Sequence, residues 1–231
     1  MPEPRGLFVV FEGGDRVGKS TQVAALAAAL AVSGVDHVVT HEPGDTEVGR
    51  RIRAMLLDPA SRLDDRCEAL LYAADKAQHI HEVVAPALAA GGVVVCDRYI
   101  DSMLAYQGAG RDLAADDLEA IAAWATRGLR PDLTVLLDAD PSKAVARIVD
   151  KDRLEGAGDE FHARVREGFL RLAAAHPERY LVCEALTSLN GIAATVRGAV
   201  GHLLGRELAV PELPEPDGAD WGDQDDREGG A

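Results

Sequence analysis

Short apolar runs alternate with longer helical patterns along most of the chain. Each run is bounded by turn residues, which is typical of strands buried on both faces. The runs cover residues 7–11, 37–40, 93–97, 133–137 and 180–183. Because strands and helices alternate, the sequence predicts an α/β fold with a five-stranded parallel sheet covered by helices on both faces. Ligands of such folds gather at the carboxyl ends of the strands.

Helical patterns fill the segments between these runs. A helix is expected after residue 20 and another after residue 46, and further helices are expected over residues 65–90, 114–126, 141–149, 161–175 and 192–204. Asp45 or Thr46 could cap the second helix, and Pro86 is expected to kink or break the third. The glycine-rich segment 106–111 is expected to be a loop.

A phosphate-binding loop pattern follows the first apolar run. Gly13 is separated by four residues from Gly18, Lys19 and Ser20, and an alanine-rich helical pattern comes next. Backbone N–H groups at a helix N-terminus wrap a phosphate chain, and glycines let the backbone come close. A chance glycine turn before a helix is the alternative, but the order of strand, loop and helix favours nucleotide binding. The expected ATP-binding residues are Gly13, Gly14, Asp15, Arg16, Val17, Gly18, Lys19, Ser20 and Thr21.

Charge and cysteine content limit the possible partners. The formal net charge is −15, which argues against nucleic acid or an anionic membrane as the main partner. The three cysteines are far apart in sequence and suit neither a disulfide framework nor a zinc site. A reducing compartment, the cytoplasm, is therefore expected. The sequence has no recognisable signal peptide and no apolar run long enough to span a bilayer.

The composition changes near the C-terminus. Residues 211–231 hold eight acidic residues and one arginine, with several prolines and glycines. Such a segment buries too little apolar surface to fold, so a disordered, solvated tail without a catalytic role is expected. We therefore predict one folded domain over residues 1–206 and an acidic tail over residues 207–231.

Several further motifs occur in a fixed order and together resemble the thymidylate kinase family. They are Phe11-Glu12-Gly13 with the loop, Glu42-Pro43-Gly44, Ile52-Arg53, Tyr72 to Gln78, Asp97-Arg98-Tyr99, Ala105 to Arg111, Arg130 to Leu133 and Asp152 to Glu155. The resemblance covers roughly residues 6–205. It implies a P-loop NTPase fold, a short lid at about residues 150–158, Mg²⁺ with ATP, and usually a homodimer. It also implies phosphorylation of dTMP to dTDP for dTTP synthesis.

The resemblance assigns phosphate and metal chemistry to a few residues. Ser20 and Asp97 would hold Mg²⁺, although Asp97 could instead orient the acceptor phosphate or simply cap its strand. Lys19 would neutralise the outer phosphates of ATP. Arg98 should grip the acceptor phosphate by a bidentate contact, with Arg53 as a second phosphate-binding arginine. The alternatives for these two arginines are surface ion pairs or exposed helix charges.

The acceptor nucleoside would be read by side chains from several segments. Asp15 resembles the acid that accepts a hydrogen bond from the acceptor's 3′-hydroxyl, but it could also be a turn carboxylate. Tyr72 and Lys76 are four residues apart and share a helix face, which suits a ring stacking on a base and a cation reaching its carbonyl. Tyr72 could equally be a core aromatic. Gln107 could read the base edge or hold its own segment together. The expected acceptor-binding residues are Asp15, Glu42, Pro43, Arg53, Tyr72, Lys76, Arg98, Ser102, Tyr106 and Gln107.

Arg16 is the most informative single residue. Negative charge on the transferring phosphoryl oxygens is stabilised by a well-placed arginine. Members of the family supply it from the loop or from the lid. Here the loop contains Arg16, whereas the lid between Arg147 and Arg153 offers only Lys151. Arg16 is therefore expected to be the catalytic arginine, with Lys19, Asp97 and Arg153 completing the catalytic set.

Four positions depart from the family pattern and leave the acceptor open. Asp45 stands where glycine or arginine is usual, and it would repel a monophosphate unless it turns away or pairs with Arg50 or Arg51. His41 and Lys76 each replace an arginine, and Met103 replaces a smaller residue or threonine. A kinase for dUMP or a modified pyrimidine deoxynucleotide is one alternative to a dTMP kinase. A non-catalytic nucleotide-binding module is another.

Overall fold

The computed structural model describes residues 6–141, 158–185 and 187–211. Five strands are described, namely β1 (Phe8–Gly13), β2 (His37–His41), β3 (Val93–Asp97), β4 (Leu133–Asp138) and β5 (Tyr180–Glu184). The helical elements are α1 (Lys19–Val32), α2 (Glu47–Leu57), α3 (Asp65–His79), η1 (Ile80–Val84), α4 (Ala85–Ala89), α5 (Ile100–Met103), η2 (Leu104–Gly110), α6 (Ala115–Ala125), α8 (Asp159–Ala175), η5 (Pro177–Arg179) and α9 (Leu189–Leu203). The predicted helix over 141–149 and the predicted lid lie almost wholly outside the described residues.

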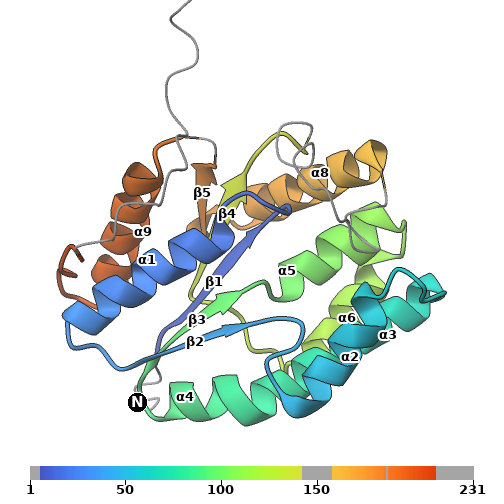
Figure 1. Ribbon diagram of the computed structural model, residues 1–231, viewed down its shortest axis with the longest axis horizontal. Coiled ribbons are helices and arrows are strands. Elements are labelled where there is room, and N and C mark those ends of the chain that lie inside the picture. The colour runs from blue at the N-terminus through green and yellow to red at the C-terminus, as the bar shows by residue number, and fades with distance from the viewer. Residues whose placement is uncertain (1–5, 142–157, 186, 212–231) are drawn as a thin grey trace, which may run out of the picture.

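The five strands form one parallel sheet in the order β2-β3-β1-β4-β5. Helices α1 and α9 lie on one face, and the helices from α2 to α6, together with α8, lie on the other (Figure 1). Alternate residues of β1 supply the two cores: Phe8 and Val10 pack with the second set of helices, whereas Val9 and Phe11 pack with α1 and α9. This alternation explains why the strand is apolar from Phe8 to Phe11. The predicted α/β fold is confirmed.

The strand registers bring the ends of three strands to one edge of the sheet. Phe11 pairs with Asp97 of β3, and Gly13 pairs with Leu137 of β4. The backbone N–H of Arg98, just beyond β3, donates to the carbonyl of Phe11 at 2.9 Å. The first turn after β1 and the polar end of β3 are therefore neighbours, as expected for a parallel sheet that binds a ligand at its carboxyl edge.

The prediction of a loop at residues 106–111 is wrong. This segment continues from α5 as the π-helix η2, and only Arg111 lies outside it. Its glycines allow close helix packing: a Cβ at Gly110 would lie 2.6 Å from the Phe161 ring of α8. From the other side, a Cβ at Gly168 would lie 3.0 Å from the Cβ of Ala109. Glycine here serves contact between two helices, which a reading based on turn residues cannot distinguish from a loop.

Two helix-boundary predictions have clear outcomes. Thr46, not Asp45, caps α2, because its hydroxyl accepts from the backbone N–H of Gly49 at 2.9 Å. The chain stays helical through Pro86, which lies in the first turn of α4, where the missing N–H costs little. The regular α-helical pattern is instead interrupted before Pro86, by the π-helical turn Ile80–Val84.

The chain remains packed beyond α9. Leu208 is buried in the core beside α1 and α9, and the backbone N–H of Ala209 donates to the Ser33 hydroxyl at 2.8 Å. Residues 212–231 lie outside the described part of the chain. The division into a domain over 1–206 and a tail over 207–231 therefore stays a prediction, and the packing extends at least to Ala209.

Candidate active site

The phosphate-loop residues form a tight turn between β1 and α1. Gly13 has a φ of +135°, and a Cβ on it would lie 2.4 Å from the carbonyl oxygen of Leu137. Only glycine fits where the loop passes this close to β4. Gly18 is the N-cap of α1, and Lys19 is the first residue of that helix. The loop's N–H groups therefore lie at the N-terminus of a 14-residue helix, where partial positive charge favours an anion.

Lys19 lies over its own loop. Its Nζ donates to the carbonyl oxygens of Gly14, at 2.5 Å, and Gly13, at 3.2 Å. The side chain is buried, and this burial together with the positive charge of Arg98 lowers the pKa of Lys19 to about 8. A lysine in this setting gains a strong partner when a phosphate enters the loop, because the phosphate supplies a directly bonded negative charge in place of the two backbone carbonyls.

Ser20 and Asp97 meet at the predicted metal site. The Ser20 hydroxyl lies 3.4 Å from Asp97 Oδ2, and Asp97 Oδ1 is buried without a hydrogen-bond partner. An unpartnered buried carboxylate oxygen is costly unless a ligand satisfies it. A hydroxyl beside such an oxygen is a donor set that suits Mg²⁺ when phosphates and water complete the shell. Within the described ranges, no group of three or more His, Cys, Asp or Glu side chains could hold a metal by itself.

Arg98 lies at the centre of a polar network. Its guanidinium donates to Asp15 at 2.5 Å, to the Ser102 hydroxyl at 3.0 Å and to the Tyr106 hydroxyl at 3.3 Å, as well as to the Gly13 carbonyl at 3.1 Å. The Tyr106 hydroxyl donates in turn to Asp15 at 3.0 Å. Burial alone would raise the pKa of Asp15, yet the Arg98 charge lowers it below its usual value. The carboxylate is therefore ionised and holds Arg98 in place.

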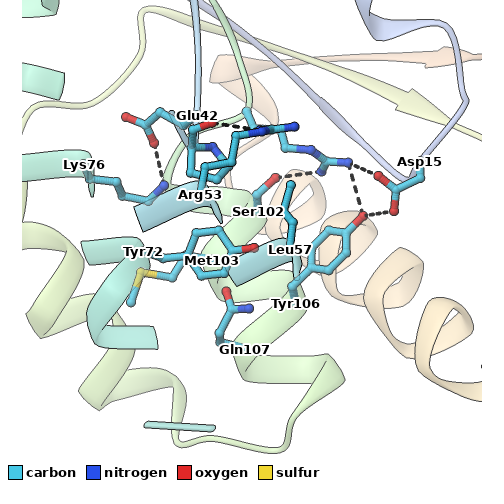
Figure 2. Close-up of a pocket in the computed structure, with 12 residues that line it drawn as sticks. Asp15, Glu42, Arg53, Leu57, Tyr72, Lys76, Ser102, Met103, Tyr106 and Gln107 are labelled. Carbon is cyan, nitrogen blue, oxygen red and sulfur yellow. Dashed lines mark hydrogen bonds and ion pairs between the residues drawn. The ribbon is translucent and has the colours of Figure 1, made fainter. Parts of the chain in front are cut away.

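A pocket opens between this network and helix α3. Figure 2 shows Asp15 and Tyr106 on one side of the pocket and Lys76 with Glu42 on the other. Its lining residues are Asp15, Glu42, Pro43, Arg53, Leu57, Tyr72, Lys76, Arg98, Ser102, Met103, Tyr106 and Gln107. All ten residues predicted to bind the acceptor are among them. Sequence segments that are far apart therefore meet at one concave site.

Lys76 lines the pocket, but its charge is already paired. Its Nζ donates to Glu42 at 2.6 Å, and both side chains are buried. Burial lowers the pKa of a lysine, but the Glu42 carboxylate outweighs it and raises the pKa of Lys76. Glu42 also accepts from His79 Nδ1 at 2.7 Å. Lys76 is therefore a cation held in place by Glu42, and its predicted contact with a base carbonyl stays a prediction.

The middle of the pocket is apolar. The rings and chains of Tyr72, Met103 and Leu57 lie between the two polar ends (Figure 2), and Met103 is 1% exposed. Gln107 lies at the same site and donates its amide to the buried Glu68 at 2.8 Å. This contact agrees with the expectation that Gln107 holds its own segment, and its role toward a ligand stays a prediction.

Arg53 reaches the pocket from α2. Its Nη1 donates to the Pro43 carbonyl at 2.8 Å, and its aliphatic stem lies over Gly44, where a Cβ would be only 2.7 Å from Arg53 Cδ. Gly44 has a φ of +114°. The glycine of the Glu-Pro-Gly motif therefore allows the arginine to cross the backbone and point toward the acceptor pocket.

Asp45 turns away from the pocket. It accepts a short hydrogen bond from Thr40, and Asp45 Oδ1 lies 3.8 Å from His41 Nδ1. It does not line the pocket, and Arg51 pairs with Glu47 instead. The first of the two expected ways to avoid repulsion, turning away, is therefore what this carboxylate adopts.

Arg16 lies exposed in the phosphate loop with a φ of +61°. It does not line the acceptor pocket. Its predicted catalytic role is untested by this geometry, which places it on the donor side. Arg153, the other predicted catalytic arginine, lies outside the described residues, as do Arg147 and Lys151.

Sequence reasoning missed two buried supports of the pocket. His79 links Glu42 to Thr40, at 2.7 Å and 2.6 Å, and Glu68 accepts from Gln107. His79 is three residues after Lys76 and seven after Tyr72, so helical spacing places all three on one face of α3. That spacing could have identified His79. Glu68 carries no comparable signal, because its partners Gln107 and Arg111 lie 39 and 43 residues further along the chain.

The fold and site together define a class of protein. A phosphate loop, a hydroxyl and carboxylate beside it, and an arginine-containing pocket at the same sheet edge are the parts that a P-loop nucleotide kinase needs. Comparison with known proteins identifies the family.

A family model described as thymidylate kinase matches residues 11–196. The thymidylate kinase of Cutibacterium acnes is 57% identical over 202 residues, which cover 87% of this chain and 99% of the relative. The thymidylate kinase of Clavibacter michiganensis is 50% identical over 196 residues, covering 83% and 93%. A crystal structure of thymidylate kinase from Ehrlichia chaffeensis matches with a TM-score of 0.70 and 28% identity, covering 85% of this chain and 99% of that one.

The chain belongs to the thymidylate kinase family, and it is an ATP-dependent nucleoside monophosphate kinase. The resemblance deduced from its motifs is confirmed. The alternative of a non-catalytic nucleotide-binding module is set aside. Across the described part of the chain, no helix combines the length and apolarity needed to cross a membrane.

Proposed function

We propose that this enzyme transfers the γ-phosphoryl group of Mg²⁺-ATP to dTMP, forming dTDP and ADP for dTTP synthesis. The observation that carries this proposal is the pocket beside the phosphate loop, with the Arg98 guanidinium at one side and the Lys76–Glu42 pair at the other. A nucleoside monophosphate has matching parts: an anionic phosphate, a base whose flat faces are apolar, and a polar base edge.

On the donor side, the residues from Gly13 to Thr21 bind the ATP phosphates. Their N–H groups surround the phosphate oxygens, and Lys19 moves its ammonium from the loop carbonyls to the outer phosphates. Ser20 and Asp97 would hold Mg²⁺, which when bound neutralises charge on the β- and γ-phosphates. The unpartnered Asp97 Oδ1 supports this assignment.

On the acceptor side, Arg98 grips the monophosphate with its planar fork, and Arg53 contributes a second positive charge. Asp15, which pairs with Arg98 in the empty site, accepts from the sugar 3′-hydroxyl once the phosphate has taken its place on Arg98. Tyr72 stacks on the base. Lys76 and Gln107 face the base edge, and the remaining members of the acceptor site are Glu42, Pro43, Ser102 and Tyr106.

Transfer requires a cation near the moving phosphoryl group. We assign this role to Arg16, which the loop itself carries on the donor side. Arg153 of the lid over residues 150–158 is the second candidate for contact with the phosphates. Both assignments follow from the charge that develops on the transferring oxygens.

A related acceptor is the second candidate, because one observation favours it. Met103 is buried and lines the pocket where the base is expected, and Lys76 is fixed by Glu42. A bulkier wall changes which pyrimidine fits, and a lysine lacks the planar donor pair of an arginine. A kinase that also accepts dUMP or a modified pyrimidine deoxynucleotide is consistent with both features.

A panel of monophosphates tests the proposal. ADP release is measured by a coupled assay with dTMP, dUMP, dCMP and dGMP, at fixed Mg²⁺-ATP. We expect dTMP to give the highest kcat/KM. A tenfold higher kcat/KM with another monophosphate would contradict the dTMP assignment. A Met103→Thr variant is compared with the wild type. If Met103 helps to select the base, the ratio of kcat/KM for dTMP to kcat/KM for dUMP should differ between the two.

We also propose a homodimeric, cytoplasmic enzyme with one kinase domain over residues 1–206 and an acidic tail over 207–231. Family membership supports both the assembly and the location. Sedimentation of the full chain tests the oligomeric state, for which a single species of twice the chain mass is expected.

A further inference from the structure

One buried carboxylate of the site's central strand has no role in the chemistry described so far. Glu12 is the fifth residue of β1, directly before the first loop glycine, and its side chain is fully buried. Taking a carboxylate out of water is costly unless hydrogen bonds or charges compensate for it. The hydrogen-bond partners of Glu12 therefore indicate which part of the structure this buried carboxylate holds in place.

Within the described part of the chain, the Glu12 side chain accepts hydrogen bonds from the residues that follow β3 on the acceptor side. Glu12 Oε1 accepts from the backbone N–H groups of Tyr99, at 2.8 Å, and Ser102, at 3.1 Å. Glu12 Oε2 accepts from the Ser102 hydroxyl at 2.6 Å. The strand that enters the phosphate loop is thus tied to the start of the helical segment Ile100–Gly110.

That helical segment forms one wall of the acceptor pocket. Ser102, Met103, Tyr106 and Gln107 all belong to it and all line the pocket. The backbone of Glu12 is held in the sheet, because Glu12 belongs to β1 and β1 pairs with both β3 and β4. A shift of this carboxylate would therefore move the donor loop and the acceptor wall relative to each other.

The Ser102 hydroxyl connects Glu12 to Arg98 through two hydrogen bonds. A serine hydroxyl has one proton to donate, and Ser102 gives it to Glu12. The oxygen lone pairs of Ser102 are then available to Arg98, whose Nη1 donates to the hydroxyl at 3.0 Å. Burial and the Asp101 carboxylate raise the pKa of Glu12 to about 7, so above that pH Glu12 is ionised and can only accept, and the serine then presents an acceptor to the arginine.

We propose that Glu12 is a positioning residue for the acceptor phosphate site: it fixes the Ser102 hydroxyl as a hydrogen-bond acceptor for Arg98 and anchors the Ile100–Gly110 wall to the strand that leads into the phosphate loop. This inference rests on the proposed function, because Arg98 is the group assigned to the acceptor phosphate. Glu12 itself touches neither substrate.

A Glu12→Gln variant tests the link with almost no change in shape. The amide oxygen can still accept from the two backbone N–H groups, so the amide NH₂ faces Ser102 and donates to its hydroxyl oxygen. The Ser102 proton must then turn elsewhere, and Arg98 must share the hydroxyl oxygen with the amide, which weakens their contact. We expect the KM for the best acceptor monophosphate to rise about tenfold, as for a lost hydrogen bond to a charged group, while the KM for ATP changes less than twofold.

The matched control is Asp132→Asn. Asp132 Oδ2 accepts from the backbone N–H of Phe8 at 2.8 Å, at the opposite end of the same strand. This variant removes the charge of a carboxylate bound to β1 without touching the pocket. It should lower the melting temperature and leave both KM values within twofold of wild type. A rise in acceptor KM equal to that of Glu12→Gln would show a general effect of β1 and would overturn the proposal.

A second set of variants decides the outcome even if Glu12→Gln does not fold. Ser102→Ala removes the link, whereas Ser102→Thr keeps the hydroxyl. Supporting results are a raised acceptor KM for the alanine variant, its recovery with threonine, and a Glu12→Gln/Ser102→Ala double variant no worse than the poorer single variant. An unchanged KM for Ser102→Ala, or single effects that multiply in the double variant, would overturn it. Wild type with dTMP is measured alongside, so a failure of dTMP as acceptor is seen separately.

Discussion

The donor and acceptor sides of the active site are neighbours, yet they prepare for their ligands differently. On the donor side, polar groups are left open: Asp97 Oδ1 has no hydrogen-bond partner, and Ser20 is exposed at 3.4 Å from Asp97 Oδ2. On the acceptor side, the two main cations are already paired, Arg98 with Asp15 and Lys76 with Glu42. The donor side leaves a carboxylate oxygen of Asp97 without a partner and Lys19 bonded to backbone carbonyls, whereas the acceptor side pairs its cations with carboxylates of the protein.

The difference has an energetic consequence. A buried arginine or lysine without a counterion is strongly unfavourable, so pairing within the protein keeps the empty pocket folded and its cations aimed. The acceptor phosphate must then compete with Asp15 for Arg98. Binding on this side is an exchange of partners, and selectivity follows from how well the incoming dianion replaces the contact. The predictions below separate the two sides, in decreasing order of effect.

Replacing Arg98 should have the largest effect. Arg98→Ala removes the proposed phosphate grip and leaves Asp15 without its main counterion. We expect kcat/KM for dTMP to fall on the order of a thousandfold, about 4 kcal/mol, while ATP affinity changes less than threefold. Steady-state kinetics and an ATP titration measure both quantities.

The control for this variant is Arg51→Ala. Arg51 is exposed and pairs with Glu47 at 2.8 Å, a contact of small energetic value. It should behave as wild type in both assays. Equal losses of ATP and dTMP affinity in Arg98→Ala would contradict the separation of the two sides.

Arg16→Gly should affect turnover more than binding. Arg16 has a φ of +61°, which glycine adopts without strain, so the fold should tolerate the change. We expect kcat to fall on the order of a hundredfold while ATP still binds. Near-normal turnover of this variant would refute the catalytic role, and a lid residue would then be the candidate.

ATP binding should weaken at alkaline pH because of Lys19. Its pKa is lowered to about 8, first by burial and then by Arg98, so the amine is charged below that pH and becomes neutral above it. If only the charged form binds phosphate well, ATP affinity should fall up to about tenfold for each pH unit above 8. Titrations at pH 7 and 9, at constant ionic strength, measure the change.

Lys19→Arg is the comparison, because an arginine keeps its charge throughout this range. Its ATP affinity should vary less between pH 7 and 9 than that of wild type. A constant affinity for the wild type over the same range would show that Lys19 is charged at both pH values, against this account of the donor side.

Asp45→Asn should have the smallest effect. The carboxylate is turned toward Thr40 and His41, away from the pocket, and an asparagine oxygen can still accept from Thr40. We expect the KM for dTMP to change less than threefold. A larger fall in KM would mean that the Asp45 charge reaches the acceptor phosphate and would call for a different position of the side chain in the bound state.

The local geometry of the phosphate loop could be predicted from sequence. Its residues are contiguous, and each spacing from Gly13 to Ser20 reflects a close approach, a helix start or a side chain in the first turn. The five strands were also predictable, because apolar runs buried on both faces leave a plain signal. Such local geometry depends on residues that are adjacent in sequence, so the sequence predicts it.

The acceptor side was predictable in its membership but not in its internal contacts. The family motifs supply the lining residues, yet the Lys76–Glu42 pair joins side chains 34 positions apart, and Glu68 meets Gln107 at a separation of 39. The direction of Asp45 and the helical state of residues 104–110 also depend on packing against other elements. Tertiary contacts decide these features, so a single sequence leaves them open.

A crystal structure with dTMP and a non-hydrolysable ATP analogue tests the central claim, the exchange of partners at Arg98, most directly. The account predicts that the Arg98 guanidinium lies about 3 Å from two acceptor phosphate oxygens, with the Arg98–Asp15 contact lengthened or broken and the base against Tyr72. A phosphate bound elsewhere, with Arg98 still held only by Asp15, Ser102 and Tyr106, would contradict it.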